Sequence, residues 1–187
     1  MTPVDEQLIA DHLALDKLRQ QLQRALANRK LEETREKLDH FWARLAVHIR
    51  AEHLHLFPLV LNKLQLKKPL PGPAPPIEAA EGAVTTLQSD HDFFMSELGR
   101  AVKIIHGLPA SADPWMVETA LHEIAHKVEQ VSRRLMTHND MEESQIYRCV
   151  SIVLTSEEQV DLAQRISAEL IKRPARFTLE AWSNVAK

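Results

Sequence analysis

Apolar residues recur along most of this chain at intervals of three and four positions, the spacing that gathers side chains on one face of an α-helix. Five segments show this pattern, and proline, glycine or polar residues separate them. The pattern predicts helices over about residues 3–28, 31–66, 78–106, 114–153 and 156–173. The expected fold class is therefore all-α.

Capping signals mark where several of these helices begin. Such signals place a short polar side chain before the first turn, often followed by proline or by a glutamate three residues later. They occur at Thr2 with Pro3, at Asp113 with Pro114, and at Thr155 with Glu158. We expect these pairs to open the first, fourth and fifth helices.

Prolines divide the chain into two halves. Pro58 lies inside the second helical pattern and is expected to kink or end that helix. The segment Pro69–Pro76, PLPGPAPP, cannot be helical and predicts a stiff extended crossover. Four long helices with one long crossover predict an up-and-down four-helix bundle over residues 1–154. Residues 155–187 are expected to form an additional C-terminal helix and a tail.

Composition narrows the function classes. Lys+Arg 23 against Asp+Glu 26 gives a formal charge of -3, and the two signs are interspersed, so no nucleic-acid partner is expected. No apolar run approaches the roughly 20 residues of a membrane span, and the first residues lack a signal-peptide pattern. Cys149 is the single cysteine, so no disulfide framework is expected. These features predict a cytoplasmic protein with no membrane partner.

A short polar motif occurs twice, once on each side of the crossover. Each copy has an Asp-His pair on one helix and a His-x-x-x-Glu pair on the next. The copies are Asp11-His12 with His48 and Glu52, and Asp90-His91 with His138 and Glu142. Residues four apart lie about 40° apart around a helix and about 6 Å along it, so each His and Glu can bind at one site.

Both His-x-x-x-Glu pairs lie on the apolar stripe of their helix, so the expected ligand face is the core face. Burying these groups without partners would cost several kcal/mol, which a bound metal would offset. Imidazole and carboxylate together suit iron, manganese or zinc, and two opposed carboxylates can bridge two cations. Separate core histidines with local hydrogen bonds are the alternative, but the duplication favours a dinuclear site.

These residues resemble the hemerythrin-like, or HHE cation-binding, family over about residues 5–150. The stretch HIRAEHLHLFPLV, from His48 to Val60, carries the most specific part of the likeness. The resemblance implies a non-haem di-iron centre, with manganese or zinc less favoured than iron. It implies that Glu52 and Glu142 bridge the two ions, and that the terminal ligands are His12, His48, His91 and His138.

The chain departs from that family at two positions. Met95 stands where the oxygen carriers have a fifth histidine, so positions on the metal are expected to stay open for water, dioxygen or nitric oxide. His53 follows the first motif glutamate where the family often has an acidic residue, whereas Glu143 keeps that acid in the second copy. His55, seven residues after His48, is a candidate extra ligand.

The other histidines are interpreted without a metal role. Helix geometry turns His122 and His126 far from His138, so this His-x-x-x-His pair is not expected to join the site. We interpret both, together with His40 and His106, as surface or interhelical residues. The three tryptophans are interpreted as packing residues, namely Trp42, Trp115 and Trp182.

Three functions fit these features. The favoured one is a di-iron protein that binds or senses a small diatomic ligand or a redox state. The alternative is an enzyme-like role in iron-centre repair or in the reduction of peroxide or nitric oxide, although the residues ahead of the first predicted helix hold no cysteine like that of the family's repair proteins. The third is a structural or interaction module with an empty or zinc-filled site. A partner protein or a homodimer is left open.

Overall fold

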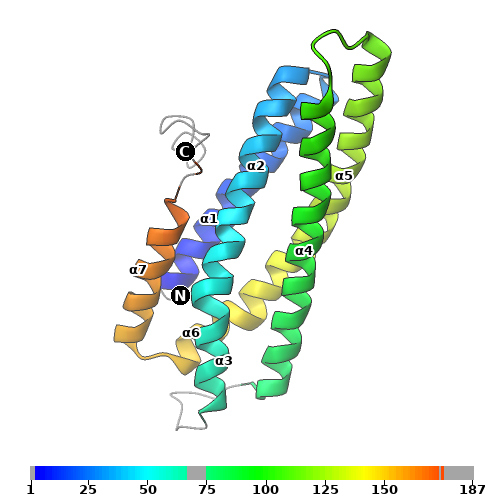
Figure 1. The fold of residues 1–187 in the computed structure, drawn as a ribbon. Helices are drawn as coiled ribbons and strands as arrows, with labels where there is room; N and C mark the ends of the chain where they lie inside the picture. The colour runs from blue at the N-terminus through cyan, green and yellow to red at the C-terminus, as the bar shows by residue number, and fades with distance from the viewer. Residues whose placement is uncertain (1–2, 67–74, 173, 175–187) are drawn as a thin grey trace.

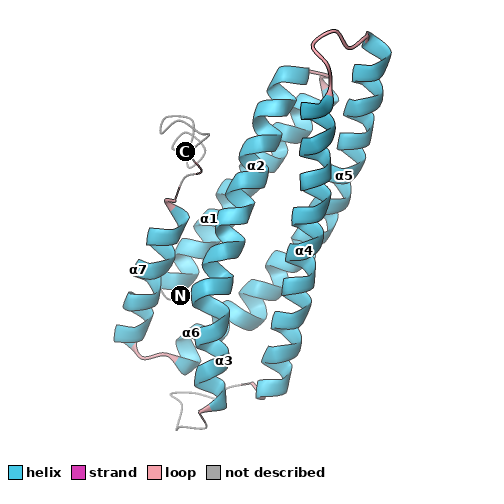
Figure 2. Cartoon of the chain, viewed as in Figure 1, coloured by secondary structure: helices cyan, strands magenta, loops and turns pink. Residues whose placement is uncertain are grey.

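The computed structural model describes residues 3–66, 75–172 and 174. All regular elements in these ranges are helical, which confirms the all-α prediction for them (Figure 2). The α-helices are α1 (Pro3–Ala27), α2 (Leu31–Ala51), α3 (Phe57–Gln65), α4 (Ile77–Gly107), α5 (Pro114–Met141), α6 (Arg148–Val153) and α7 (Ser156–Leu170). Two π-helical segments, η1 (Glu52–Leu56) and η2 (Glu142–Tyr147), join α2 to α3 and α5 to α6.

Two of the predicted caps are present. The Asp113 side chain accepts a hydrogen bond of 2.8 Å from the Met116 N–H at the start of α5. Thr155 and Glu158 exchange the two hydrogen bonds of a capping box at the start of α7, at 3.3 and 3.0 Å. The predicted cap at Thr2 lies outside the described residues, as does most of the proline-rich crossover.

The helix that begins at Leu31 passes through Pro58 without ending there. It changes to π-helical geometry at Glu52, and the Phe57 N–H bonds to the Glu52 carbonyl five residues back. Proline cannot donate a backbone hydrogen bond and crowds the preceding turn of an α-helix. The wider π turn lies directly ahead of Pro58, but η2 has the same geometry with Arg148 in place of a proline. The helix predicted over 114–153 is also continuous, with η2 inserted after Met141.

The long helices α1, α2, α4 and α5 lie side by side (Figure 1). Contacts join α1 to α2, α2 to α4, α4 to α5 and α5 to α1, so each helix touches two others. The last of the described helices, α7, packs on α1 and α2. None of the described helices combines the length and the apolar character that crossing a membrane requires.

The apolar core is divided into two clusters. On α1, Leu8 belongs to one cluster and Leu15 to the other, with His12 between them in the sequence. On α4, Leu87 and Phe94 flank His91 in the same way. The motif residues therefore form a polar layer between two apolar clusters. Each fully buried leucine in these clusters stabilises the fold by about 2 kcal/mol.

Candidate metal centre

The structure brings all six predicted ligands together in the core. Each is at most 5% exposed, and both glutamates are completely buried. Their ligand atoms fall into two groups in which all atoms lie within 4.8 Å of one another. The groups are His12, His48, Glu52 and Glu142, and His91, His138 and Glu142. We name the space inside the first group position 1 and the space inside the second group position 2.

Position 1 is lined by two nitrogens and two carboxylate oxygens. The Nε2 atoms of His12 and His48 are 3.2 Å apart. Glu142 Oε2 lies 3.2 Å from His12 Nε2, and Glu52 Oε1 lies 3.5 Å from His48 Nε2. Ligand atoms about 2.1 Å from one ion and at right angles to each other are about 3 Å apart. These separations therefore suit a single metal ion.

Position 2 repeats this arrangement with the other oxygen of each glutamate. The Nε2 atoms of His91 and His138 are 3.0 Å apart. Glu142 Oε1 lies 2.8 Å from His138 Nε2 and 3.4 Å from His91 Nε2. Glu52 Oε2 lies 3.5 Å from His91 Nε2. Glu142 thus contributes one oxygen to each group, which is the arrangement of a bridging ligand, and Glu52 contributes Oε1 to the first group and turns Oε2 toward His91 of the second.

The outer nitrogen of every ligand histidine has a partner. His48 Nδ1 lies 2.9 Å from Asp11, and His138 Nδ1 lies 3.2 Å from Asp90. His12 Nδ1 lies 3.0 Å from Glu143. A carboxylate can only accept, so each of these three Nδ1 atoms carries a proton, which leaves Nε2 as the nitrogen that could bind a metal. His91 Nδ1 contacts His53 Nε2 at 2.9 Å instead.

Two arginines hold the aspartates in turn. Arg44 bonds to Asp11, and the Arg134 Nε bonds to Asp90 at 2.5 Å. Our sequence reasoning noted the aspartates but gave them no role, and it missed both arginines. A signal was present, because each arginine stands four residues before the motif histidine of its helix. The repeat therefore includes an Arg-Asp-His chain that orients one ligand in each half.

The donor set fits metal ions better than it fits protons alone. Nitrogen lone pairs that face each other at 3.2 and 3.0 Å repel unless a positive charge lies between them. Glu52 Oε2 and Glu142 Oε1 are buried and lack a well-aligned hydrogen bond from the described residues, and the Nε2 atoms of His91 and His138 lie 3.5 and 2.8 Å from them. Buried carboxylate oxygens without well-aligned hydrogen bonds are costly in a protein core. A cation at each position would satisfy both nitrogens and both oxygens.

Without metal, protons on the histidines supply part of the positive charge that the buried carboxylates need. Burial alone would lower the pKa of His48, but Glu52 and Asp11 outweigh it and raise that pKa well above the ordinary value. Burial likewise opposes a charged His138, and the carboxylates of Glu142, Glu52 and Asp90 raise its pKa. Burial disfavours an ionised Glu142, yet the surrounding histidines hold its pKa well below the usual range. The metal-free core is thus a set of coupled charges.

Tyr147 is a site residue that the sequence did not identify. It is the single tyrosine of the chain, it ends η2, and its side chain is buried. Its hydroxyl donates to Glu52 Oε1 at 2.7 Å and lies 3.1 Å from His12 Nε2. Burial and then the carboxylates of Glu142 and Glu52 raise the pKa of Tyr147 well above its usual value. The phenol is therefore neutral when no metal is bound.

His55 does not reach the ligand cluster. Its Nε2 lies 3.9 Å from Glu169 on α7, on the outer side of η1. His55, seven residues after His48, would lie on the same helix face as His48 only if every turn between them were α-helical. The π turn rotates the chain less per residue, so His55 is carried off the ligand face.

The remaining histidines and tryptophans lie away from the cluster. His122 and His126 are exposed, and His106 bonds to Asp39 across α4 and α2 at 2.9 Å. His40 is buried on α2. Trp42 packs beside the apolar core, whereas Trp115 is 74% exposed and is not the packing residue that we expected. Trp182 lies outside the described residues.

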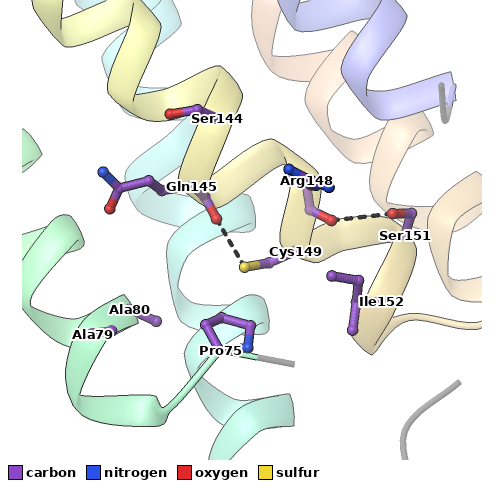
Figure 3. A pocket seen from close by; sticks show the side chains of 9 residues that line it. All are labelled: Pro75, Ala79, Ala80, Ser144, Gln145, Arg148, Cys149, Ser151 and Ile152. Carbon is purple, nitrogen blue, oxygen red and sulfur yellow. Dashed lines mark hydrogen bonds between the residues drawn. The ribbon is translucent and has the colours of Figure 1, made fainter. Parts of the chain in front are cut away.

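A cavity of about 570 Å³ lies between the start of α4 and the η2–α6 segment (Figure 3). Pro75, Ala79 and Ala80 line one side. The other side includes Cys149, whose thiol bonds to the Gln145 carbonyl at 2.8 Å. None of the six ligand residues lines this cavity. The chemistry of the ligand cluster is therefore separate from it.

We predict that Asp11→Asn weakens metal binding by about 10- to 100-fold, because the variant loses the charged acceptor that orients His48. Metal affinity measured by competition with a chelator checks this. Asp16→Asn is the matched control, since Asp16 lies on the same helix but bonds to Arg19 and Gln20. Equal affinities in Asp11→Asn and Asp16→Asn would contradict the orienting role.

Comparison with known proteins found no match for the chain among family models, curated proteins or solved structures. The geometry of the cluster is therefore the basis for inferring what the protein does.

Proposed function

We propose that this chain is a non-haem di-iron protein of the hemerythrin-like kind, an up-and-down four-helix bundle whose centre binds a small ligand or responds to redox state. One observation carries the proposal. Glu52 and Glu142 each direct one oxygen toward each of two histidine pairs in the core. Two bridging carboxylates between two imidazole pairs are suited to hold two ions close together.

The donor chemistry favours iron. Position 1 is offered two imidazole nitrogens and two carboxylate oxygens, and position 2 two imidazole nitrogens and the Glu142 oxygen with Glu52 Oε2 nearby, a mixed set that iron accepts in both common oxidation states. Manganese and zinc are the alternatives, and the buried thiol of Cys149 is not part of the cluster. Bound iron would supply Lewis acidity and a change of oxidation state. The protein's own part is to fix the ligand orientations through Asp11, Asp90 and their arginines.

Ligand binding and turnover can be separated by experiment. If the protein is a binder or sensor, nitric oxide added to the anaerobic iron(II) form changes the optical spectrum in a saturable way. In that case, the loaded protein should consume peroxide in the presence of a reductant no faster than an equal amount of free iron does. Sustained turnover well above free iron would support the enzyme-like alternative. No spectral change with either molecule would overturn the proposed ligand-binding role.

The structure also predicts how iron binding depends on pH. Protons on His48 and His138 compete with metal, and both histidines have raised pKa values in the metal-free protein. Iron affinity should therefore fall with decreasing pH, starting above the ordinary histidine value of 6.5. Glu142 resists protonation because its pKa is lowered. Iron retained after equilibration across a pH series measures this, and full retention down to pH 4.5, the ordinary value for Glu142, would contradict it.

A further inference from the structure

We propose that the phenol oxygen of Tyr147 is a further ligand at position 1, whereas Phe57 leaves position 2 open, so that small ligands bind at position 2. This inference rests on the proposed di-iron centre and assigns different roles to its two ions.

The Tyr147 hydroxyl lies among the ligand atoms of position 1. It is 2.7 Å from Glu52 Oε1, 3.1 Å from His12 Nε2 and 3.4 Å from Glu142 Oε2. The four protein ligands of position 1 are separated by similar distances, between 3.2 and 3.5 Å where they are neighbours. Atoms that share one ion at right angles are about 3 Å apart. The hydroxyl therefore has the spacing of a fifth ligand.

The repeat places a phenylalanine at the equivalent point of the other half. Tyr147 follows Glu142 by five residues, and Phe57 follows Glu52 by five. Each ring stacks on the histidine of the Asp-His pair at its own position: Tyr147 on His12 with centroids 5.6 Å apart, and Phe57 on His91 at 6.1 Å. Both rings are 1% exposed. The two halves thus differ by one oxygen atom at this point, and position 2 lacks it.

The partners of the histidine Nδ1 atoms also distinguish position 1 from position 2. At position 1, His12 and His48 are backed by the carboxylates of Glu143 and Asp11. At position 2, Asp90 backs His138, but an imidazole, His53, backs His91. Carboxylate partners make an imidazole a stronger donor. Position 1 therefore suits the more highly charged iron(III), which also favours an anionic phenolate.

Binding of the phenol to iron(III) breaks its O–H bond and forms an iron–oxygen bond. The proton is released to solvent, and no oxidation state changes. In the metal-free protein the same O–H group donates to Glu52, which explains how the buried hydroxyl is satisfied there. If the phenol only donates hydrogen bonds to Glu52 in the loaded protein, it stays neutral and gives no charge-transfer band. This difference makes the two roles distinguishable.

The test compares the iron(III)-loaded full chain with Tyr147→Phe, Phe57→Tyr and the double exchange. Iron content is measured first, followed by visible absorption and resonance Raman spectra. We expect a phenolate-to-iron(III) band with tyrosine ring vibrations in the wild type. Tyr147→Phe should lose this band and keep its iron, and the double exchange should regain it. If Tyr147→Phe also loses its iron, the presence or absence of the phenolate-to-iron(III) band in the wild type decides whether the phenol is a ligand.

Azide serves as the probe of the open position. Phe57→Tyr should weaken azide binding at least about tenfold by filling position 2, whereas Tyr147→Phe should not weaken it. Two irons per chain without a phenolate band in the wild type would overturn this inference and leave the di-iron proposal standing. A band that persists in Tyr147→Phe, or unchanged azide affinity in Phe57→Tyr, would also overturn it. Absence of iron from the wild type would overturn both.

Discussion

Replacing Glu142 with alanine is expected to remove most of the bound iron. The side chain is completely buried and places one oxygen 3.2 Å from His12 Nε2 and the other 2.8 Å from His138 Nε2. Its loss therefore takes an anionic ligand from both positions at once. Glu52→Ala should have the same effect, because Glu52 faces both positions too. Iron per chain, measured after loading and desalting, checks the prediction.

Two exposed residues of α5 give matched controls. Glu129→Ala removes a carboxylate that pairs with Arg133 at the surface, and His122→Ala removes an exposed imidazole. Both variants should keep their iron. Glu142→Gln keeps the size of the side chain but cannot bridge as an anion, so it separates ligand loss from misfolding. Retention of iron in both Glu142→Ala and Glu52→Ala would mean that the ligands lie elsewhere.

Removal of the metal is expected to lower the melting temperature by roughly 5–15 °C. An ion present at 100 to 1,000 times its dissociation constant stabilises the folded chain by about 2.7 to 4.1 kcal/mol. For a chain of this size, each kcal/mol corresponds to about 2–4 °C. Thermal melts with iron and after chelation, with metal content measured in each sample, check this. Equal melting temperatures would show that the two apolar clusters alone hold the bundle.

The stabilisation by metal should also grow with pH. Because the pKa of His48 is raised on folding, its charge stabilises the metal-free chain below pH 6.5, and this contribution is lost as pH rises through the raised pKa. Bound iron supplies the positive charge in place of the proton on His48. The difference in melting temperature between the two forms should therefore be larger near pH ~8 than near pH ~6. A difference that shrinks with rising pH would contradict this coupling.

The six residues of the buried His/Glu cluster could be identified from sequence because helical spacing fixes which residues share a face. His48 and Glu52, four residues apart on an apolar stripe, had to face the core. The Arg-Asp-His chains were also readable in principle, since they repeat in both halves. Whether two glutamates bridge, however, depends on how four helices approach one another, and periodicity along one helix does not contain that information.

The π turns mark where sequence reasoning failed. Both begin at a motif glutamate, and a shift from four-residue to five-residue hydrogen bonding has no clear signature in the residues themselves. Extending α-helical geometry through η1 made His55 a candidate ligand. The same extension in the second half gave no reason to place Tyr147 in the site. Local helix geometry, rather than residue type, decided both outcomes.

The number of iron ions per chain tests the central claim most directly. After anaerobic loading with iron(II) and removal of loosely bound metal, elemental analysis should give close to two ions per chain, one for each group of ligands in the core. The Glu142→Ala variant prepared in parallel should give far less. No bound metal, or a single zinc ion that is lost in His122→Ala and kept in Glu142→Ala, would contradict the di-iron account.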